Sequence, residues 1–584
     1  MYHTLPQRAR LSVPPPLPYP RRVNTPPDPF RPRPWLLACA CVCALAWLAT
    51  WRLIDDPDAF WHLKAGQLAL QHGPALPVDT LSWSFAGQPW LGKDALADML
   101  LAAADATFGF VGLAILLAAV LTLGATGLAY GVAPPTWLLA AGLWLSAVEI
   151  TATPRSRIFS TALLPLLLAA IDRARKSPQK LWILPGMLAG AGLLLHRGGV
   201  VGLAILAVAV LTEGLEHRRW RQPVTALALA SGLALLHPDG PRVWATVLHV
   251  AGSDAYRQYV SEFQPMTFDQ AWAAFPMTVL LALLAVPAVL PALQPRGNPD
   301  LRWRGVVLLI TLLVAGRSPR GMPLLAGAAT YALLPLLERL LGLLRRPWLR
   351  GALAATVALA LVHGNATRPF GAGLNRRVLP IAAADFARRQ RLGPRVLNPL
   401  HLGGYLMWAG IAPFIDGRND QLYPDAFFVQ NARATDDPAA FAALEQAYKF
   451  DWVLAANPGP GQAFLFLAAD PAWRLVFWSD VAAIFATRRD LPAYALFSPA
   501  DPVGSIQRAT ANPATADAIG AELDRLVADD PEGIAAQIWR VMHLHLRGPA
   551  FRQKRDEALA RLLSAHRDAP EVLQLLAILK IRLP

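Results

Sequence analysis

The chain has 584 residues, of which 54% are hydrophobic and only 16% are charged, and its apolar stretches are longer than a soluble core requires. This composition excludes an ordinary water-soluble enzyme. The net charge of +14 does not indicate nucleic acid binding, because the basic residues lie in short segments between apolar runs. The three cysteines, Cys39, Cys41 and Cys43, all lie in the first apolar run, where small apolar residues of a membrane helix explain them better than a metal site does.

The first part of the chain predicts a cytoplasmic tail followed by a transmembrane domain. Residues 1–34 are rich in proline and arginine and cannot bury a core, so we expect a disordered tail. Residues 35–363 form the expected transmembrane domain, and its first span is residues 35–53. Ten more spans, about eleven in all, are expected at 107–131, 134–150, 157–172, 180–196, 199–213, 222–237, 275–293, 305–316, 321–337 and 350–363.

The basic residues between these spans predict the orientation of the chain. Arginine-rich segments lie at residues 172–180, 213–222, 294–304 and 338–350, and all four fall on the side that the arginines of the N-terminal tail place in the cytoplasm. With an odd number of spans, the N-terminus is inside and the C-terminus is outside. The expected outer segments are the first loop at 55–106, the loops at 151–156, 196–199, 238–274 and 317–320, and everything after about residue 364.

Two extracytoplasmic parts are expected after the spans. Within residues 364–504, short apolar runs alternate with turn signals and helical stretches, which predicts a small α/β domain. Residues 505–584 have few strand formers and a helical period, which predicts a helical tail of one or two helix hairpins without a full repeat signature. Such a tail offers a surface for envelope-assembly proteins.

The first outer loop opens with three carboxylates and a histidine, at Asp55, Asp56, Asp58 and His62. Unpaired carboxylates are costly at a membrane surface. If a helix begins after Pro57, Asp56 caps it, and Asp58 and His62 lie one turn apart on one face. An N-cap and an interfacial tryptophan would explain part of this pattern, but a cap needs only one carboxylate, so a catalytic base or a divalent cation site is favoured.

This loop resembles the first outer loop of bacterial integral-membrane glycosyltransferases of the GT-C superfamily. The matching positions are Asp56, Asp58, Phe60, Trp61, His62, Gly66, Pro77, Asp79, Ser82, Gly87, Pro89, Trp90 and Asp94. Weaker matches follow at 196–199, 237–240, 262–265 and 403–423, so the resemblance covers most of the chain from about residue 50 to 490. The chain departs from the family pattern at Arg197, at His237 and at Ala95, and these changes leave the acidic character of the first loop intact.

The resemblance implies a multi-pass enzyme of the bacterial inner membrane. It would move a sugar from a polyprenyl-phosphate carrier, which enters laterally from the membrane lipids, to an acceptor on the periplasmic or extracellular side. A first-loop carboxylate would deprotonate the acceptor hydroxyl, and Asp58 is the first choice for this base, with Asp56 and Asp94 as alternatives.

Six further residues are expected to bind the substrate, namely His62, His196, Arg197, Glu262, Arg317 and Arg320. The guanidinium groups of Arg317 and Arg320 suit a phosphate, although arginines at this depth also bind lipid headgroups. Glu262 could contact a sugar together with Tyr256 and Tyr259, or the segment could simply lie at the interface.

Several alternatives stay open at this point. Asp416 and Arg418 could bind a ligand or form an internal ion pair. No cofactor is certain, and a divalent cation at Asp56, Asp58 and His62 would need more ligands than one loop offers. A transporter or flippase of lipid-linked glycans, or a scaffold that has lost catalysis, would also have many spans, but no duplicated half and no clearly mid-membrane charge supports a transporter.

Overall fold

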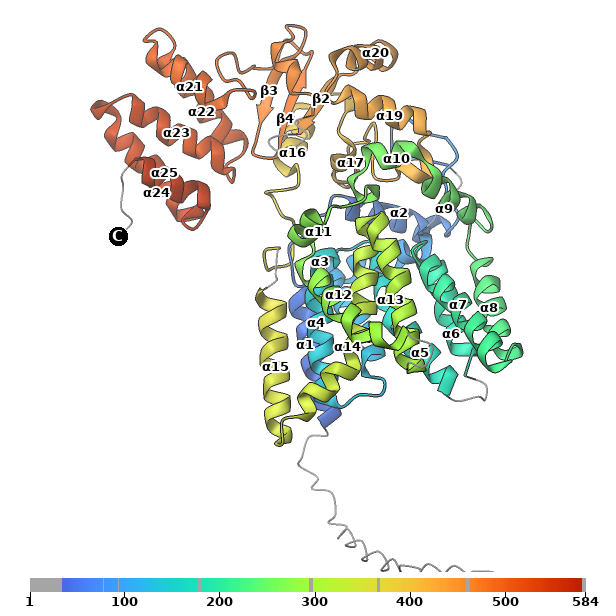
Figure 1. Cartoon of the computed structure of the whole chain (residues 1–584). Helices are drawn as coiled ribbons and strands as arrows, with labels where there is room; N and C mark the ends of the chain where they lie inside the picture. Colours follow the sequence, from blue (N-terminus) through green and yellow to red (C-terminus); the bar gives the residue numbers. More distant parts are fainter. Residues whose placement is uncertain are drawn as a thin grey trace, which may run out of the picture.

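The computed structural model of the chain describes residues 34–76, 78–92, 94–176, 181–293, 298–364, 368–456 and 463–579. The expected cytoplasmic tail, apart from Pro34, and Pro77 of the first-loop motif lie outside these residues. A bundle of helices forms one end of the molecule, and a smaller region with a sheet and a helical tail forms the other end (Figure 1).

Each apolar segment that the sequence predicts as a span corresponds to a helix of the bundle. These helices are α1 (Pro34–Thr50), α3 (Ala95–Thr126), α4 (Pro134–Val148), α5 (Arg157–Lys176), α6 (Ile183–Leu195), α7 (Gly199–His217), α8 (Arg221–Ala234), α12 (Pro276–Val289), α13 (Pro299–Arg317), α14 (Met322–Gly342) and α15 (Pro347–Gly364). Their buried faces share one apolar core that includes Trp144, Leu168, Trp303 and Tyr331.

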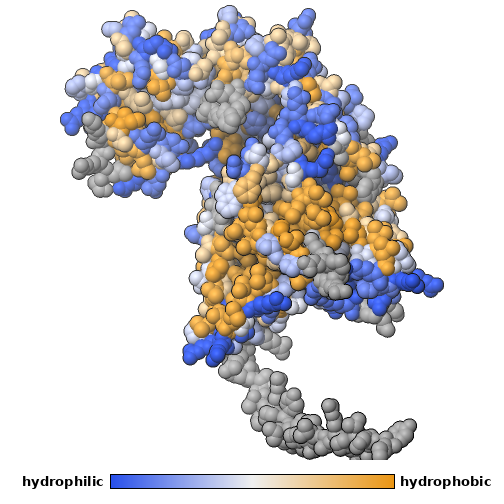
Figure 2. All heavy atoms as spheres, viewed as in Figure 1, coloured by the Kyte–Doolittle hydropathy of each residue, from blue (hydrophilic) through white to orange (hydrophobic). Residues whose placement is uncertain are grey.

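Among the residues that the structure describes, three segments are long and apolar enough to cross a membrane by themselves, at Ala95–Ala129, Gly199–His217 and Pro319–Gly342. A fourth is present if α11 (Phe268–Ala274) and α12, which meet at an angle of 119°, count as one span. Figure 2 shows apolar side chains gathered over the bundle, with hydrophilic residues above and below them. The bundle is therefore the membrane-embedded part of the chain, while the full set of eleven crossings and their direction stay predictions.

The first loop builds a platform at one end of the bundle. Helix α2 (Asp58–His72) packs along the first half of α3, and a Cβ at Gly66 would clash with the carbonyl oxygen of Asp98, so glycine allows this close approach. Helix α3 bends at Phe108 and Gly109, where Gly109 has a φ of +58° that favours glycine. The half of α3 before the bend belongs to the loop, and the apolar half begins where the sequence predicts the span.

The C-terminal region contains a four-stranded sheet in the order β1-β2-β4-β3. Strand β1 (Val396–Leu397) pairs in parallel with β2 (Trp452–Ala456), while β4 (Ala482–Ala486) is antiparallel to β2 and to β3 (Arg474–Trp478). Alternate residues face two apolar clusters. Leu454 and Ile484 pack with residues of α16 (Ile381–Gln390), whereas Val453 and Phe485 belong to the cluster that includes α19 (Asp425–Ala434) and α20 (Pro438–Tyr448).

A tail of helices follows the sheet. It consists of α21 (Pro502–Ala511), α22 (Ala516–Asp529), α23 (Ile534–Leu546), α24 (Arg552–His566) and α25 (Pro570–Ile578). Helix α22 contributes Ile519, Leu523 and Leu526 to the apolar cluster of the sheet, and α23 to α25 form a small core of their own.

The first loop and the C-terminal region are joined by a buried ion cluster. The Nη1 atom of Arg418 lies 2.6 Å from Asp79 Oδ1, and its Nη2 atom lies 2.8 Å from Asp416 Oδ2, with none of the three side chains exposed to solvent. Nearby, Trp83 Nε1 donates to the carbonyl of Val396 at 2.9 Å. Of the two interpretations that the sequence left open for Asp416 and Arg418, the internal ion pair is the one that these contacts support.

Candidate functional site

A cavity of about 550 Å³ lies at the end of the bundle that faces the C-terminal region. Its wall comes from the first loop, the start of α5, the connection from α6 to α7, the loop before α11, the connection from α13 to α14, and the turn at 417–420. Six of the residues predicted from the sequence line it, namely His62, Asp94, His196, Arg197, Arg317 and Arg320. The other three, Asp56, Asp58 and Glu262, lie beside it and contact its arginines.

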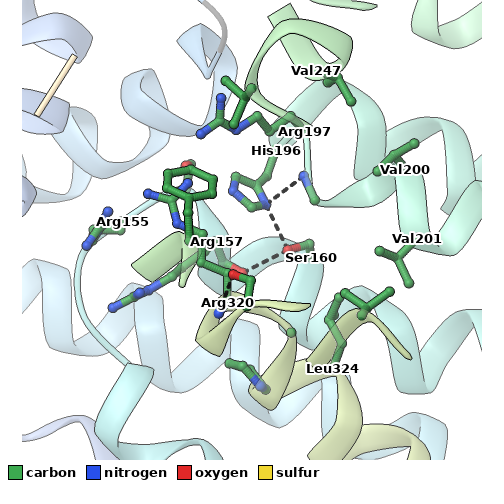
Figure 3. Close-up of a pocket in the computed structure, with 18 of the residues that line it drawn as sticks. Arg155, Arg157, Ser160, His196, Arg197, Val200, Val201, Val247, Arg320 and Leu324 are labelled. Carbon is green, nitrogen blue, oxygen red and sulfur yellow. Dashed lines mark hydrogen bonds between the residues drawn. The ribbon is translucent and has the colours of Figure 1, made fainter. Parts of the chain in front are cut away.

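The cavity is charged on one side and apolar on the other. Figure 3 shows Arg155, Arg157 and Arg320 together on one side, with Val200 and Val201 on the opposite side. The apolar wall continues with Val247, Val250, Val314 and Leu324. This division suits a ligand that has an anionic head and a hydrocarbon chain.

Asp56 is held in place by several donors at the edge of the cavity. The hydroxyl of Thr153 donates to its Oδ2 at 2.9 Å, Arg155 Nη1 lies 3.2 Å away, and Arg157 Nη2 lies 3.4 Å away. The backbone N–H of Asp58 donates to Asp56 Oδ1 at 3.1 Å, so Asp56 contacts the start of α2, but the N-cap position belongs to Pro57 and not to Asp56 as the sequence predicts. Burial raises the pKa of Asp56, but the two arginines outweigh burial and lower it. Asp56 is therefore a stable anion that orders the arginines.

Asp58 has a different electrostatic environment. Its Oδ2 atom lies 2.9 Å from Arg155 Nη2, and its side chain is 25% exposed. Burial raises the pKa of Asp58 to about 6, helped by the negative charges of Asp56 and Glu262 and opposed by Arg155. A carboxylate that titrates near neutral pH is suited to accept a proton.

Glu262 connects the arginines on the charged side of the cavity. Its Oε2 atom lies 2.7 Å from Arg320 Nη2, and its Oε1 atom lies 3.4 Å from Arg155 Nη1 and 3.5 Å from Arg157 Nη1. The hydroxyl of Ser318 donates to the Glu262 carbonyl at 2.6 Å. Burial raises the pKa of Glu262, but the three arginines lower it well below its usual range. Glu262 is therefore an anion that fixes the positions of these arginines.

Of the two interpretations that the sequence left open for Tyr256 and Tyr259, the packing of the two rings does not favour a sugar contact. Tyr256 is fully buried and stacks on Phe428 with a ring-centroid distance of 5.5 Å. Tyr259 is half-buried and also packs against Phe428, edge to face at 6.3 Å. Both aromatic rings therefore join α10 (Asp254–Tyr259) to the C-terminal region.

The two histidines and Arg197 make contacts that fix their orientation. The Nδ1 atom of His196 accepts a hydrogen bond from the Gly198 N–H at 3.1 Å and lies 2.9 Å from Ser160 Oγ (Figure 3). His62 Nδ1 lies 2.5 Å from Asp98 Oδ1 in the first half of α3. Arg197 forms an ion pair with Asp420, which lies in α18 (Asn419–Leu422) of the C-terminal region.

The three residues considered for a divalent cation do not converge. Asp56 and Asp58 face arginines, and His62 faces Asp98. Over the described ranges of the chain, no group of three or more histidine, cysteine, aspartate or glutamate side chains is arranged to hold a metal ion. The positive charge at this site comes from guanidinium groups.

Sequence reasoning missed several residues of the site, above all Arg155 and Arg157. A signal was present, because Arg155 lies in the predicted outer loop 151–156 and Arg157 begins the span predicted after it, and basic residues are unusual on the outer side. Gly417 and Asp420 were also missed, although they lie in the motif segment 403–423. Their role depends on contacts with residues more than 200 positions away, which no local pattern reveals.

Comparison with known proteins gives structural neighbours only. No protein-family model and no curated protein matches the chain. Among solved structures, ArnT from Cupriavidus metallidurans bound to undecaprenyl phosphate is 13% identical with a TM-score of 0.48, and the match covers 79% of this chain and 99% of that chain. The archaeal oligosaccharyltransferase AglB from Archaeoglobus fulgidus, in complex with an inhibitory peptide and a dolichol-phosphate, is 10% identical with a TM-score of 0.49 and coverages of 88% and 86%.

A third neighbour is the arabinofuranosyltransferase AftD from Mycobacteria, which is 14% identical with a TM-score of 0.49, over 78% of this chain and 40% of that chain. All three neighbours are membrane glycosyltransferases of the GT-C superfamily, the superfamily that the first-loop motifs resemble. Since these scores are below 0.5, we draw the function from the residues of the site.

Proposed function

We propose that this chain is a membrane glycosyltransferase of the GT-C type, which moves a sugar from a polyprenyl-phosphate carrier to an extracytoplasmic acceptor. One observation carries the proposal. A carboxylate whose pKa burial raises to about 6, that of Asp58, lies beside a cavity that has an arginine-rich side and an apolar side. That combination provides a general base, a site for a phosphate and a site for a hydrocarbon chain within one enclosure.

The donor would bind across the divided cavity. Its phosphate would lie among the arginines, and the first isoprene units would lie along the wall that includes Val200, Val201 and Leu324. Of the arginines, Arg155, Arg157 and Arg320 are paired with Asp56, Asp58 and Glu262. Arg317 is exposed and forms no ion pair with any residue that the structure describes, so its charge is available to the phosphate.

The proposed reaction uses Asp58 as the base. Its carboxylate accepts the proton of the acceptor hydroxyl as the acceptor oxygen forms a bond to the anomeric carbon. The bond from that carbon to the phosphate oxygen breaks, and the electron pair leaves with the polyprenyl phosphate. Guanidinium groups stabilise the negative charge that develops on the leaving group. Asp56 is less suited to this role because its pKa is lowered, and the remaining alternative is Asp94, which is buried in the cavity wall.

The same proposal includes the location of the protein. A bacterial inner membrane holds the bundle, with the N-terminus in the cytoplasm and the C-terminal region in the periplasm or outside the cell. The arginine-rich segments at 172–176, 213–222 and 338–350 support this direction, because they lie at the end of the bundle away from the cavity (Figure 1).

The test of this function is an analysis of glycans and lipid-linked sugars in cells with the wild-type chain, with no chain, or with the Asp56→Ala/Asp58→Ala variant at matched abundance. We expect the cells without the chain and the cells with the variant to lose the same sugar from a glycan and to accumulate its carrier lipid. A variant that restores the wild-type glycan would exclude a catalytic role of these carboxylates and would favour a scaffold or a transporter.

Removal of the charge of Arg317 is expected to weaken binding of the carrier lipid. For Arg317→Ala, we expect the Kd of undecaprenyl phosphate to rise about tenfold, because one charge-assisted contact to the phosphate is lost. A titration of the purified protein in nanodiscs measures this change. Arg339→Ala, in the last turn of α14, is the matched control, since Arg339 is also exposed and lies far from the cavity. An equal affinity for both variants would place the phosphate elsewhere.

A further inference from the structure

A turn of the C-terminal region lies directly against the carboxylate that we propose as the base. This turn, as the name is used below, comprises residues 416–420, of which Asn419 and Asp420 are the first two residues of the short helix α18. Its conformation is fixed by Arg418, whose side chain is fully buried between Asp416 and Asp79. The turn therefore holds its position relative to the first loop.

Gly417 is the residue of this turn that approaches the base. A Cβ atom at this position would clash with Asp58 Oδ1 and would lie 2.6 Å from the indole nitrogen of Trp61. Gly417 does not have a positive φ, so its backbone conformation is available to alanine. The lack of a side chain at residue 417 is therefore required by the close approach of Asp58 and Trp61 and not by the backbone.

A second glycine of the C-terminal region supports this close approach. Gly404 lies in α17 (Leu400–Trp408), and a Cβ atom there would clash with the carbonyl oxygen of Pro57 and would lie 3.6 Å from the Cα atom of Asp58. The C-terminal region thus contacts both the backbone and the carboxylate of Asp58. On the far side of the carboxylate, Arg155 Nη2 lies 2.9 Å from Oδ2.

The turn also reaches into the cavity itself. Gly417, Asn419 and Asp420 line the cavity wall, and Asp420 forms an ion pair with Arg197 from the connection between α6 and α7. The turn thus lies beside Asp58 through Gly417 and beside Arg197 through Asp420.

We propose that Gly417 is a positioning residue for Asp58. The turn confines Oδ1 while Arg155 holds Oδ2, so the carboxylate keeps one orientation toward the cavity. The C-terminal region, although separate from the membrane bundle, is then part of the catalytic site. This inference rests on the proposed function. Residue 417 affects catalysis only because it fixes the orientation of the Asp58 carboxylate.

The experiment is a double-mutant cycle on the purified full-length protein in nanodiscs. The four proteins are the wild type, Gly417→Ala, Asp58→Asn and the double variant. The donor is the lipid-linked sugar extracted from cells without the chain, and membranes of the same cells supply the acceptor. Gly252→Ala is the matched control, because a Cβ atom there meets open space and its φ is not positive.

For Gly417→Ala we expect kcat to fall about tenfold or more, with the donor KM changed by less than about twofold, because the added methyl group displaces the carboxylate and leaves the arginines in place. In the Asp58→Asn background, the same change is expected to lower the residual rate by less than about twofold, since its target is already lost. The dependence of kcat on pH should also change in Gly417→Ala, because the displaced carboxylate leaves its charged neighbours.

Two results would overturn the inference while the proposed function stands. One is a Gly417→Ala protein with wild-type kcat. The other is an equal loss of kcat when Gly417→Ala is made in the wild type and in Asp58→Asn, which would indicate general damage to the fold. A wild-type rate in Asp58→Asn would instead contradict the proposed base. The cycle therefore separates a failure of the inference from a failure of the function on which it rests.

Discussion

Replacement of Asp58 by asparagine is expected to reduce the rate of sugar transfer by about a hundredfold to ten-thousandfold, while the protein remains folded in the membrane. Asparagine keeps the size of the side chain and can still accept a hydrogen bond from Arg155, which lies 2.9 Å away. What it loses is the ability to take up a proton. Single-turnover transfer with the extracted lipid-linked donor measures this loss directly.

The pH dependence gives the same prediction an independent readout. Because burial and the neighbouring carboxylates raise the pKa of Asp58 to about 6, the base is deprotonated and active above that pH. We expect the wild-type rate to fall as pH decreases through about 6, by about tenfold for each further unit. The residual rate of Asp58→Asn should lack this fall, since no proton can occupy the amide.

Two control variants define the outcome. Asp269→Asn changes an exposed carboxylate of α11 and should leave the rate unchanged. Asp94→Asn tests the alternative base, because Asp94 lines the same cavity. If Asp94→Asn removes the pH dependence and Asp58→Asn retains it, the base is Asp94 and our assignment of Asp58 is wrong.

The helices of the bundle could be predicted from the sequence because each depends on local composition. A run of apolar residues such as 199–213 forms a helix wherever it lies in the bundle, and the structure has α7 at Gly199–His217. The bend at Gly109 separates the loop half of α3 from its apolar half. It lies two residues after residue 107, where hydropathy predicts that the span begins.

The site could be predicted only in part, because it depends on contacts between distant segments. The carboxylates Asp56 and Asp58 were recognised by their density and by the family motif. Their charge partner Arg155 comes from a segment about a hundred residues away, and Gly417 comes from a different part of the fold. The sequence left a sugar contact of Tyr256 open for the same reason, since nothing near Tyr256 in the sequence shows that Phe428 stacks on its ring.

The expected result for Arg418→Met is the largest loss of stability among the single substitutions considered for this chain. The change would leave Asp79 and Asp416 without a cation where neither side chain reaches solvent. Removal of one partner of a buried ion pair costs about 3–5 kcal/mol, because the remaining charge is uncompensated. The first loop and the C-terminal region should separate, and transfer should fall together with the melting temperature of the protein in detergent.

The cost arises from unpaired charge, and this can be tested apart from the size of the side chain. In Asp79→Asn/Asp416→Asn/Arg418→Met, no charge of this cluster remains. The Asp79 carboxylate accepts hydrogen bonds from the Leu81 and Ser82 N–H groups at 3.0 and 3.1 Å, and the amide oxygen of the asparagine can still accept one of them. We expect this triple variant to regain part of the lost melting temperature. Arg395→Met is the control, because its ion pair with Asp451 is 46% exposed on the arginine side and should contribute less than about 1 kcal/mol. A triple variant as unstable as Arg418→Met would show that packing of the guanidinium, not its charge, joins the two regions.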